Sequence, residues 1–342
     1  MGPGAGRAQG PLNQSEVRYG PSVMRHVTWD KGISLVGHDL WLDPLTVRDL
    51  AFVSHAHTDH TRRHRSALMT GGTHAMLTPD RRPRGVRLLA LEERHQLGEA
   101  TVSLHCAGHM LGSAQLLFEY GGWRLLYTGD LRLRRGAVQP DTPIPAADVI
   151  VIESTYGKPH FRFPDPDSVA EHVARWCHRA LDARVTPVLL AHALGKAQEL
   201  MLALAPFGLR FALEERCVPF VRGYEGAGVA MPDWVELSGE PGDRVVIAPP
   251  VGKDAIRGLS RYRTALVSGW ALDSFWRVFG ADVAFPLSDH CDFDDLIEVI
   301  RRSGAHQVYT VHGFSSDFAR HLKRRGVRAH PLHQTEQLAF AI

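Results

Sequence analysis

Residues 54–60 read Ser-His-Ala-His-Thr-Asp-His, which places four possible metal ligands within six positions, directly after a short apolar stretch. That stretch predicts a buried strand. Alternate side chains of an extended strand end point to the same side, so His55 and His57 are expected to face one way. Asp59 and His60 then fall in the following turn, where they can reach a second ion. Imidazole and carboxylate together suit zinc or a similar first-row metal better than magnesium or calcium, so the run predicts a metal centre rather than a solvated loop.

Three later strands are predicted to end on a residue of the same kind. His109 follows the alternating segment 101–106 and is flanked by glycines, which allow a tight turn. Asp130 follows the apolar segment 123–127 in a Thr-Gly-Asp sequence, and its carboxylate can bridge two metals. Glu153 closes a near-continuous apolar strand of the kind that is buried on both faces. A buried carboxylate is costly unless it is paired, so we expect a metal or histidine partner for Glu153.

The composition is that of an ordinary globular chain, with 342 residues of which 44% are hydrophobic and 22% charged. No apolar run approaches the roughly 18 residues of a membrane span. Residues 1–20 lack the apolar core of a secretory signal, so we expect a disordered lead-in and a cytoplasmic protein without a membrane contact. Four cysteines without Cys-x-x-Cys spacing predict buried thiols.

The net charge is only +2, which excludes an overall basic field, but 34 of the 39 positive residues are arginine and several are clustered. The cluster within residues 62–65 directly follows the histidine run. Arginine patches form grooves that bind a phosphate backbone, and they also form solvated faces. Both interpretations stay open at this point.

Taken in order, these motifs resemble the metallo-β-lactamase fold, and more narrowly its nuclease branch, called β-CASP. The series is His-x-His-x-Asp-His, Gly-His-x-x-Gly-Ser, Thr-Gly-Asp and Glu-Ser-Thr-Tyr-Gly. Residues 286–290 resemble motif B of that branch and residues 309–313 resemble its motif C; the resemblance spans about residues 30–333. Within the branch, three segments look most like the bacterial ligase-associated DNA exonucleases, namely residues 193–198, 268–270 and 288–290.

The resemblance implies an α/β protein, an αββα sandwich formed by residues 21–160 and 285–342 with an inserted β-CASP α/β cap at residues 161–284. Strand-helix alternation within the cap agrees, and it predicts parallel strands. Other local patterns predict a capping box at residues 168–171 followed by a helix, a strand at 187–191, a helix at 194–204, and a core-facing helical stripe of Phe293, Leu296, Ile297 and Ile300.

The resemblance also implies a ligand set for two divalent metal ions, zinc or alternatively manganese. The first ion would be held by His55, His57, His109 and Asp130, and the second by Asp59, His60, His312 and the same Asp130. The pair would activate a hydroxide for in-line attack on phosphorus.

Catalytic roles are implied for Asp59, which would orient the hydroxide, and for the pair Glu153 and His290. Glu153 would hold the imidazole, and His290 would protonate or otherwise stabilise the departing 3′ oxygen. Phosphate contacts are expected from the hydroxyls of Ser154, Thr155 and Ser288, and base stacking from Trp270. Local backbone contacts for the hydroxyls and a core position for the tryptophan are the alternatives.

We therefore expect a metal-dependent phosphodiesterase, a DNA exonuclease that works 5′ to 3′ on single-stranded ends in DNA repair, with an ATP-dependent DNA ligase and a helicase as functional partners. The alternative is an RNA-processing β-CASP ribonuclease, endonucleolytic or 5′ exonucleolytic. His312 favours this alternative, because RNA-processing members have histidine at motif C, whereas the cap motifs favour DNA. A cap together with His290 and His312 disfavours a small-molecule hydrolase.

Overall fold

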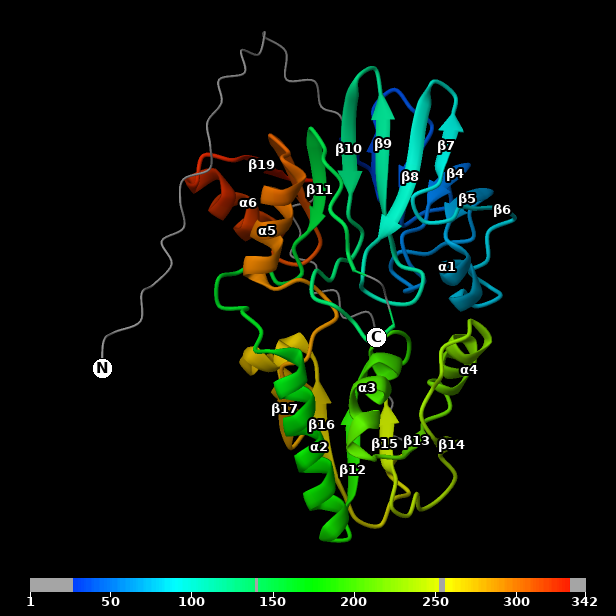
Figure 1. Ribbon diagram of the computed structural model, residues 1–342, viewed down its shortest axis with the longest axis vertical. Helices are drawn as coiled ribbons and strands as arrows, with labels where there is room; N and C mark the ends of the chain where they lie inside the picture. Colours follow the sequence, from blue (N-terminus) through cyan, green and yellow to red (C-terminus); the bar gives the residue numbers. More distant parts are fainter. Residues whose placement is uncertain (1–26, 139–140, 252–255, 333–342) are drawn as a thin grey trace.

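The computed structural model describes residues 27–138, 141–251 and 256–332, so the predicted lead-in at residues 1–20 lies outside the described residues. These residues form an upper lobe with two sheets and a lower lobe with a third (Figure 1). The helices are α1 (Gly71–Met76), α2 (Pro166–Asp182), α3 (Lys196–Leu204), α4 (Val218–Gly226), α5 (Phe293–Ser303) and α6 (Ser315–Arg324), and short 3₁₀ turns span Ala205–Phe207, Gly269–Leu272 and Ser274–Phe279. None of the helices in this part of the chain combines the length and apolar character that crossing a bilayer requires.

Two sheets face each other in the upper lobe. The first has the order β1 to β6, with bounds Val27–Trp29, Ile33–Leu35, Trp41–Leu42, Leu50–Phe52, Ser66–Met69 and Gly85–Leu88. The second has the order β19-β18-β11-β10-β9-β8-β7, with bounds Arg328–Pro331, Gln307–Val311, Val149–Glu153, Trp123–Tyr127, Ala114–Tyr120, Ala100–Cys106 and Arg94–Leu97. Helix α1 packs on the outer face of the first sheet, and α5 and α6 pack on the outer face of the second. The predicted αββα sandwich is confirmed.

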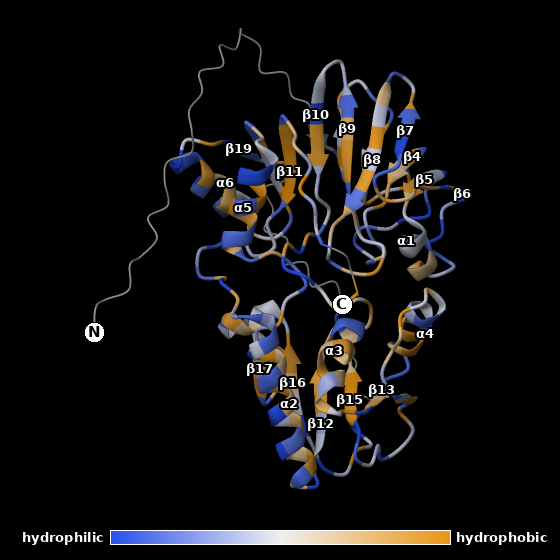
Figure 2. Ribbon diagram, in the orientation of Figure 1, coloured by the Kyte–Doolittle hydropathy of each residue, from blue (hydrophilic) through white to orange (hydrophobic). Residues whose placement is uncertain are grey.

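Strand β11 is buried on both faces, as its near-continuous apolar sequence predicted. Val149 and Val151 lie in the core between the two sheets, whereas Ile150 and Ile152 lie in the core beneath α5 and α6. Alternate residues of a strand point to opposite faces, so both faces of β11 have to be apolar. Figure 2 shows this strand as hydrophobic along its length. Its last residue, Glu153, therefore emerges from the middle of the core. All four cysteines are buried thiols outside any disulfide, as predicted.

The third sheet, in the lower lobe, is parallel throughout, as the strand-helix alternation predicted. Its order is β14-β13-β15-β12-β16-β17, with bounds Trp234–Glu236, Phe211–Leu213, Val245–Ala248, Thr186–Leu190, Tyr262–Val267 and Val283–Phe285. The carboxyl ends of β12, β16 and β17 point toward the upper lobe (Figure 1), which is the edge where parallel sheets bind ligands. We propose residues 161–284 as the cap domain and the rest of the chain from residue 21 as the sandwich domain.

Helix α2 begins earlier than predicted. The capping box at residues 168–171 is wrong, because the helix starts at Pro166 and Asp165 is its N-cap. The Asp165 carboxylate accepts a hydrogen bond from the N–H of Ser168 at 3.0 Å, so the serine lies inside the first turn. Proline suits the first helical position, since it has no N–H to leave unpaired there.

Helix α5 confirms three of the four residues of the predicted buried stripe. Phe293, Leu296 and Ile300 are buried against β11 and α6, and Val299 is buried with them. Ile297 is only half-buried. The helix starts directly after the motif B segment because Asp292 caps it by accepting from the N–H of Asp295 at 2.9 Å.

Candidate metal centre and active site

The histidine run follows β4 and turns into the interface between the two lobes. The alternation predicted that His55 and His57 point to the same side, and Nε2 of His55 lies 3.1 Å from Nδ1 of His57. His109 arrives from the loop after β8, and its Nε2 lies 3.3 Å from the same Nδ1. Oδ2 of Asp130, from the loop after β10, lies 3.5 Å from Nε2 of His55 and 3.9 Å from Nε2 of His109.

These four ligand atoms fit a tetrahedral cation. Zinc bonds nitrogen at about 2.0–2.1 Å, so ligand atoms at the corners of its tetrahedron lie about 3.3 Å apart. The four separations given above, 3.1 to 3.9 Å, bracket that value, and all four residues have ligand atoms within 4.8 Å of one another. Imidazole nitrogens this close repel one another unless a proton or a cation lies between them.

A second group of ligand atoms shares Asp130 with the first. Nε2 of His60 lies 3.5 Å from Oδ2 of Asp130, and Oδ2 of Asp59 lies 3.8 Å from Nε2 of His60. His60, Asp130 and His312 have ligand atoms within 4.8 Å of one another. Nε2 of His312 and Oδ1 of Asp59 are buried without a hydrogen-bond partner. Unsatisfied buried polar atoms of this kind are what a bound cation would saturate. The structure thus brings together all seven residues expected as ligands.

His312 reaches this position in an uncommon backbone conformation. It follows the end of β18 with a φ of 58°, in the left-handed region. Non-glycine residues in this region carry a conformational cost and cluster at functional sites. Ser154 anchors the segment, since its buried hydroxyl lies within hydrogen-bond distance of the carbonyls of Val311 and His312, at 2.7 and 2.8 Å.

Asp43 organises the histidines from behind, and the sequence analysis missed it. Its Oδ2 accepts from Nδ1 of His60 at 2.8 Å and from the hydroxyl of Tyr127 at 2.8 Å. The Ser54 hydroxyl donates to the same carboxylate at 2.5 Å and lies 2.9 Å from Nδ1 of His55. Asp43 therefore fixes the ring orientation of His60 directly and that of His55 through Ser54, so that Nε2 of each ring faces the centre.

A signal for Asp43 was present in the sequence. Asp43 directly follows an apolar strand end, Leu42 of β3. No other ligand-type residue stands next to Asp43 in the sequence, and Pro44 follows it. An aspartate before a proline is ordinarily interpreted as a turn residue. Only the pairing of β3 with β4 places it behind the histidine run.

Burial keeps most of the histidines neutral. Burial lowers the pKa of His57, and it lowers the pKa values of His55 and His109 well below the ordinary value. Burial and the neighbouring His60 lower the pKa of His312 to about 4. A neutral imidazole has a lone pair to offer, so these rings can bind a cation at neutral pH without first losing a proton.

His60 behaves differently because three carboxylates surround it. Burial opposes its charged form, but Asp130, Asp59 and Asp43 outweigh burial and raise the pKa of His60 to about 10. Burial also raises the pKa of Asp130 to about 7, against the pull of His60. Without a cation, the centre keeps a proton where a metal would otherwise neutralise the carboxylates.

Glu153 and His290 form a hydrogen-bonded pair beside the ligands. Nδ1 of His290 lies 3.1 Å from both carboxylate oxygens of Glu153. Glu153 also accepts from the N–H of Leu131 at 2.7 Å and from that of Thr155 at 3.4 Å. The imidazole rings of His290 and His109 have centroids 4.5 Å apart. Burial works against the charge on His290, but the Glu153 carboxylate outweighs it and raises the pKa of His290 to about 9.

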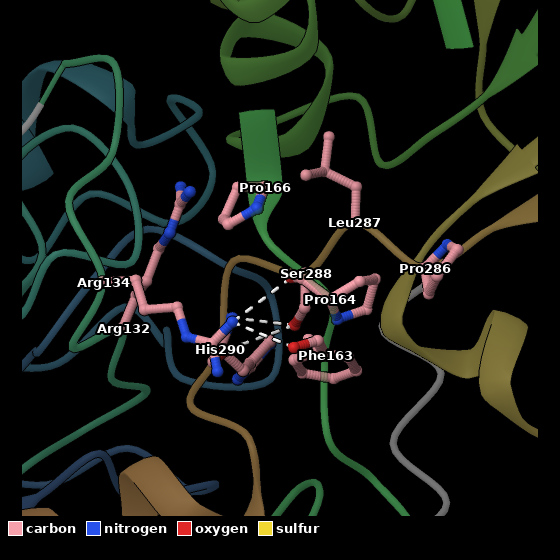
Figure 3. A pocket seen from close by; sticks show the side chains of 9 residues that line it. All are labelled: Arg132, Arg134, Phe163, Pro164, Pro166, Pro286, Leu287, Ser288 and His290. Atoms are coloured by element: carbon pink, nitrogen blue, oxygen red, sulfur yellow. Dashed lines mark hydrogen bonds between the residues drawn. The ribbon is translucent and has the colours of Figure 1, made fainter. Parts of the chain in front are cut away.

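A small pocket opens next to His290 (Figure 3). Ser288, Arg132 and Arg134 contribute polar groups to its wall, together with apolar groups such as Phe163. Ser288 supports the histidine locally, because its hydroxyl oxygen accepts from the N–H of His290 at 3.0 Å. Both arginines are ion-paired within the protein, Arg132 with Glu199 at 3.3 Å and Arg134 with Asp292 at 2.5 Å.

Trp270 follows β16 and lies in an aromatic cluster at the junction of the lobes. Its ring centroid is 5.1 Å from that of Tyr156 and 5.5 Å from that of Phe161, and the ring is only partly buried. Phosphate contacts by Ser154, Thr155 and Ser288 and base stacking by Trp270 stay predictions, since the hydroxyls of the two serines and this ring already have partners within the protein.

Arg62, the first residue of the arginine cluster, supports the loop together with Arg81, whereas Arg63 and Arg65 are exposed. Nη1 of Arg62 donates to the carbonyls of Thr58 and Thr61, each at 2.6 Å, and Nη1 of Arg81 donates to Thr61 at 3.0 Å. These bonds hold the turn that carries Asp59.

Comparisons with known proteins find relatives whose names refer to DNA ligation and to RNA processing. It is 36% identical over 92% of its length to a protein of Opitutus terrae named probable DNA ligase, and covers 32% of that protein. It is 32% identical over 33% of its length to an RNase J-like protein of Methanocaldococcus jannaschii, and over 34% to cleavage and polyadenylation specificity factor subunit 3 of Dictyostelium discoideum, of which it covers 27% and 17%. The chain thus spans about a third or less of the length of these relatives. No family model matches it.

Proposed function

Because the chain belongs to the β-CASP branch of the metallo-β-lactamase-fold nucleases, we propose that it hydrolyses phosphodiester bonds as a metal-dependent DNA exonuclease in repair. One observation carries the proposal: the paired Glu153 and His290 lie against a cluster able to hold divalent cations. A proton donor beside such a centre fits a reaction in which an alkoxide has to leave.

We assign the ligands as the resemblance implied them, with His55, His57, His109 and Asp130 for one cation and Asp59, His60, His312 and Asp130 for the other. Nitrogen and carboxylate donors at tetrahedral spacing favour zinc, with manganese as the alternative. Bound cations would supply a nucleophilic hydroxide at neutral pH and positive charge against the phosphate oxygens.

The protein's own residues handle the protons. His290 donates Nδ1–H to Glu153, which leaves Nε2–H to protonate the departing 3′ oxygen. The raised pKa of His290 keeps that proton in place at neutral pH. Burial opposes the charge on Asp59, but the neighbouring His60, which keeps its proton, outweighs burial and lowers the pKa of Asp59 to about 2. Its unpaired Oδ1 can accept a hydrogen bond from the attacking water.

DNA is the favoured substrate because the probable DNA ligase resembles nearly the whole of this chain. That relative is about three times longer than the matched region, so a β-CASP segment and the remainder occur in one polypeptide. This combination in one polypeptide supports a DNA ligase as the functional partner. We also propose a helicase as a partner, as the family resemblance implied. We propose action on single-stranded 5′ ends in the cytoplasm.

RNA processing is the second candidate, because His312 occupies the motif C position and two of the relatives carry names of RNA enzymes or factors. Those matches cover about a third of the chain, whereas the match to the probable DNA ligase covers nearly all of it.

The deciding experiment incubates the purified chain, with zinc or manganese, on matched DNA and RNA strands labelled at either end. We expect stepwise loss of nucleotides from the 5′ end of DNA. Asp59→Ala and His290→Ala should each lower the rate by about 100-fold or more, the usual contribution of acid-base groups. His178→Ala, on the exposed side of α2, is the matched control and should leave the rate unchanged. Efficient cleavage of RNA with DNA intact would overturn the assignment to DNA.

A further inference from the structure

A buried ion pair joins the cap to the metal centre, and the mechanism above does not use it. Lys196 is the first residue of α3 and only 6% of its surface is exposed. Its Nζ lies 2.9 Å from Oδ1 of Asp289 and donates to the carbonyl of Leu287 at 3.1 Å. Burying two charges is costly, and apolar residues of similar shape would often be at least as stable. Stability alone therefore gives no reason for a lysine here.

Asp289 reaches the metal centre through its backbone. Its carbonyl accepts a hydrogen bond from Nδ1 of His109 at 2.9 Å. A carbonyl can only accept, so the proton of His109 must lie on Nδ1 and the lone pair on Nε2, which faces Asp130. The residue that follows Asp289 is His290, so the same turn presents the proton donor.

The segment before Lys196 holds a second ligand in the same way. The carbonyl of Leu194 accepts from Nε2 of His57 at 3.0 Å, which leaves the lone pair of His57 on Nδ1. Gly195 makes this approach possible, since its φ is 85° and a Cβ there would come within 3.3 Å of the Cβ of Met110. Lys196 is thus adjacent in the chain to the carbonyl on His57 and ion-paired to the residue whose carbonyl holds His109.

We propose that Lys196 is a positioning residue for the metal centre. It clamps the start of α3 to the Asp289 turn, so that the cap carbonyl of Leu194 and the carbonyl of Asp289 fix His57 and His109 as metal ligands. This inference rests on the proposed metal centre. It makes the cap part of the binding site: the cap has to be seated for the first cation to be held tightly, and the bound cation stabilises the seated cap.

Three variants separate positioning from simple folding. Lys196→Met removes the clamp but leaves the Asp289 carboxylate buried without its partner, which is itself destabilising. The double variant Lys196→Met with Asp289→Asn removes that unpaired charge while the backbone carbonyl of residue 289 stays. Lys158→Met is the matched control, because Lys158 is partly exposed, pairs with Asp317 on α6 at 3.5 Å and lies 3.9 Å from the centroid of the Phe314 ring.

Metal affinity is measured by letting the metal-free full chain compete with a chromogenic chelator for zinc. In a second measurement, the absorption spectrum of the chain loaded with cobalt(II) is recorded. Loss of residues that orient metal ligands lowers affinity by about 10–100-fold. We expect that loss at one of the two cations in Lys196→Met and in the double variant, with an altered cobalt spectrum. The denaturation midpoint should recover in the double variant, and Lys158→Met should match the unmodified chain.

Unchanged affinity and spectrum in Lys196→Met would overturn the inference, and so would affinity that recovers in the double variant together with stability. The affinity readout does not depend on cleavage. If the chain cleaves no nucleic acid but the affinities differ as stated, the proposed nuclease function fails and the role of Lys196 stands. A chain that binds no cation at all refutes both.

Discussion

Replacing Glu153 by glutamine should move the pH dependence of cleavage toward acid by at least two pH units. Glu153 is the main group that raises the pKa of His290 to about 9, against burial. Glutamine has nearly the same shape and its oxygen can still accept from the N–H of Leu131, which Glu153 does at 2.7 Å. It carries no charge, so burial prevails and the pKa of His290 should fall to its ordinary value of about 6.5 or below.

The free energy at stake follows from that change. A difference of one pKa unit corresponds to about 1.36 kcal/mol. If the pKa of His290 falls from about 9 to about 6.5, the protonation free energy of its imidazole changes by about 3 kcal/mol in favour of the neutral ring. The donor works only when it is protonated, and its contribution disappears as the pH rises through its pKa. At pH 7.5 nearly every His290 of the unmodified protein is protonated. In the variant about a tenth or less would be, so cleavage should slow about 10-fold or more and recover toward pH 6.

The assay is the rate of digestion of an end-labelled oligonucleotide between pH 5.5 and 9.5, at saturating metal. Bound cations affect His290 equally in the variant and in the unmodified protein. The quantity to compare is therefore the difference between the two proteins in the pH at which the cleavage rate falls on the alkaline side. Glu298→Gln provides the matched control, since Glu298 is a partly exposed residue of α5 that pairs with Arg301 and Arg302. An alkaline limb at the same pH in Glu153→Gln and in the unmodified protein would refute the role given to the pair.

Three further predictions test the centre and its supports. A chelator should lower the melting temperature, because a ligand present at 100 times its dissociation constant contributes about 2.7 kcal/mol to stability; re-addition of zinc should restore it, and differential scanning calorimetry checks this. Asp43→Asn should weaken metal binding by about 10–100-fold, measured by chelator competition, because Asp43 orients His60 and, through Ser54, His55. Leu296→Ala should cost about 2–5 kcal/mol of unfolding free energy in urea and leave metal affinity unchanged, because Leu296 is fully buried beneath the second sheet.

The sandwich and the ligands were accessible to sequence reasoning for one physical reason. A strand buried on both faces has to be apolar along its length, so a polar residue at its end stands out, as Glu153 does after β11. His55, His57 and His109 follow strands in the same way. Their convergence followed from the family resemblance together with these patterns, and the geometry places their ligand atoms within 3.3 Å of a neighbour.

Residues that are important because of a partner far away in the chain could not be predicted from local sequence patterns. Asp43 carries no local pattern that separates it from a turn aspartate, and only the pairing of β3 with β4 sets it behind the histidines. The start of α2 was misplaced because Asp165 and Ser168 can both cap a helix, and a preceding proline-rich stretch gives no means to choose between them.

The sequence by itself determined which residues can bind metal and which segments must be buried, since both depend on side-chain chemistry and local periodicity. Only the tertiary structure decided which nitrogen of each histidine faces the centre, because that is set by acceptors far along the chain. Leu194 on His57 and Asp289 on His109 are separated from their partners by 137 and 180 positions. Hydrogen bonds between such distant positions exist only in the folded tertiary structure, and no local pattern encodes them.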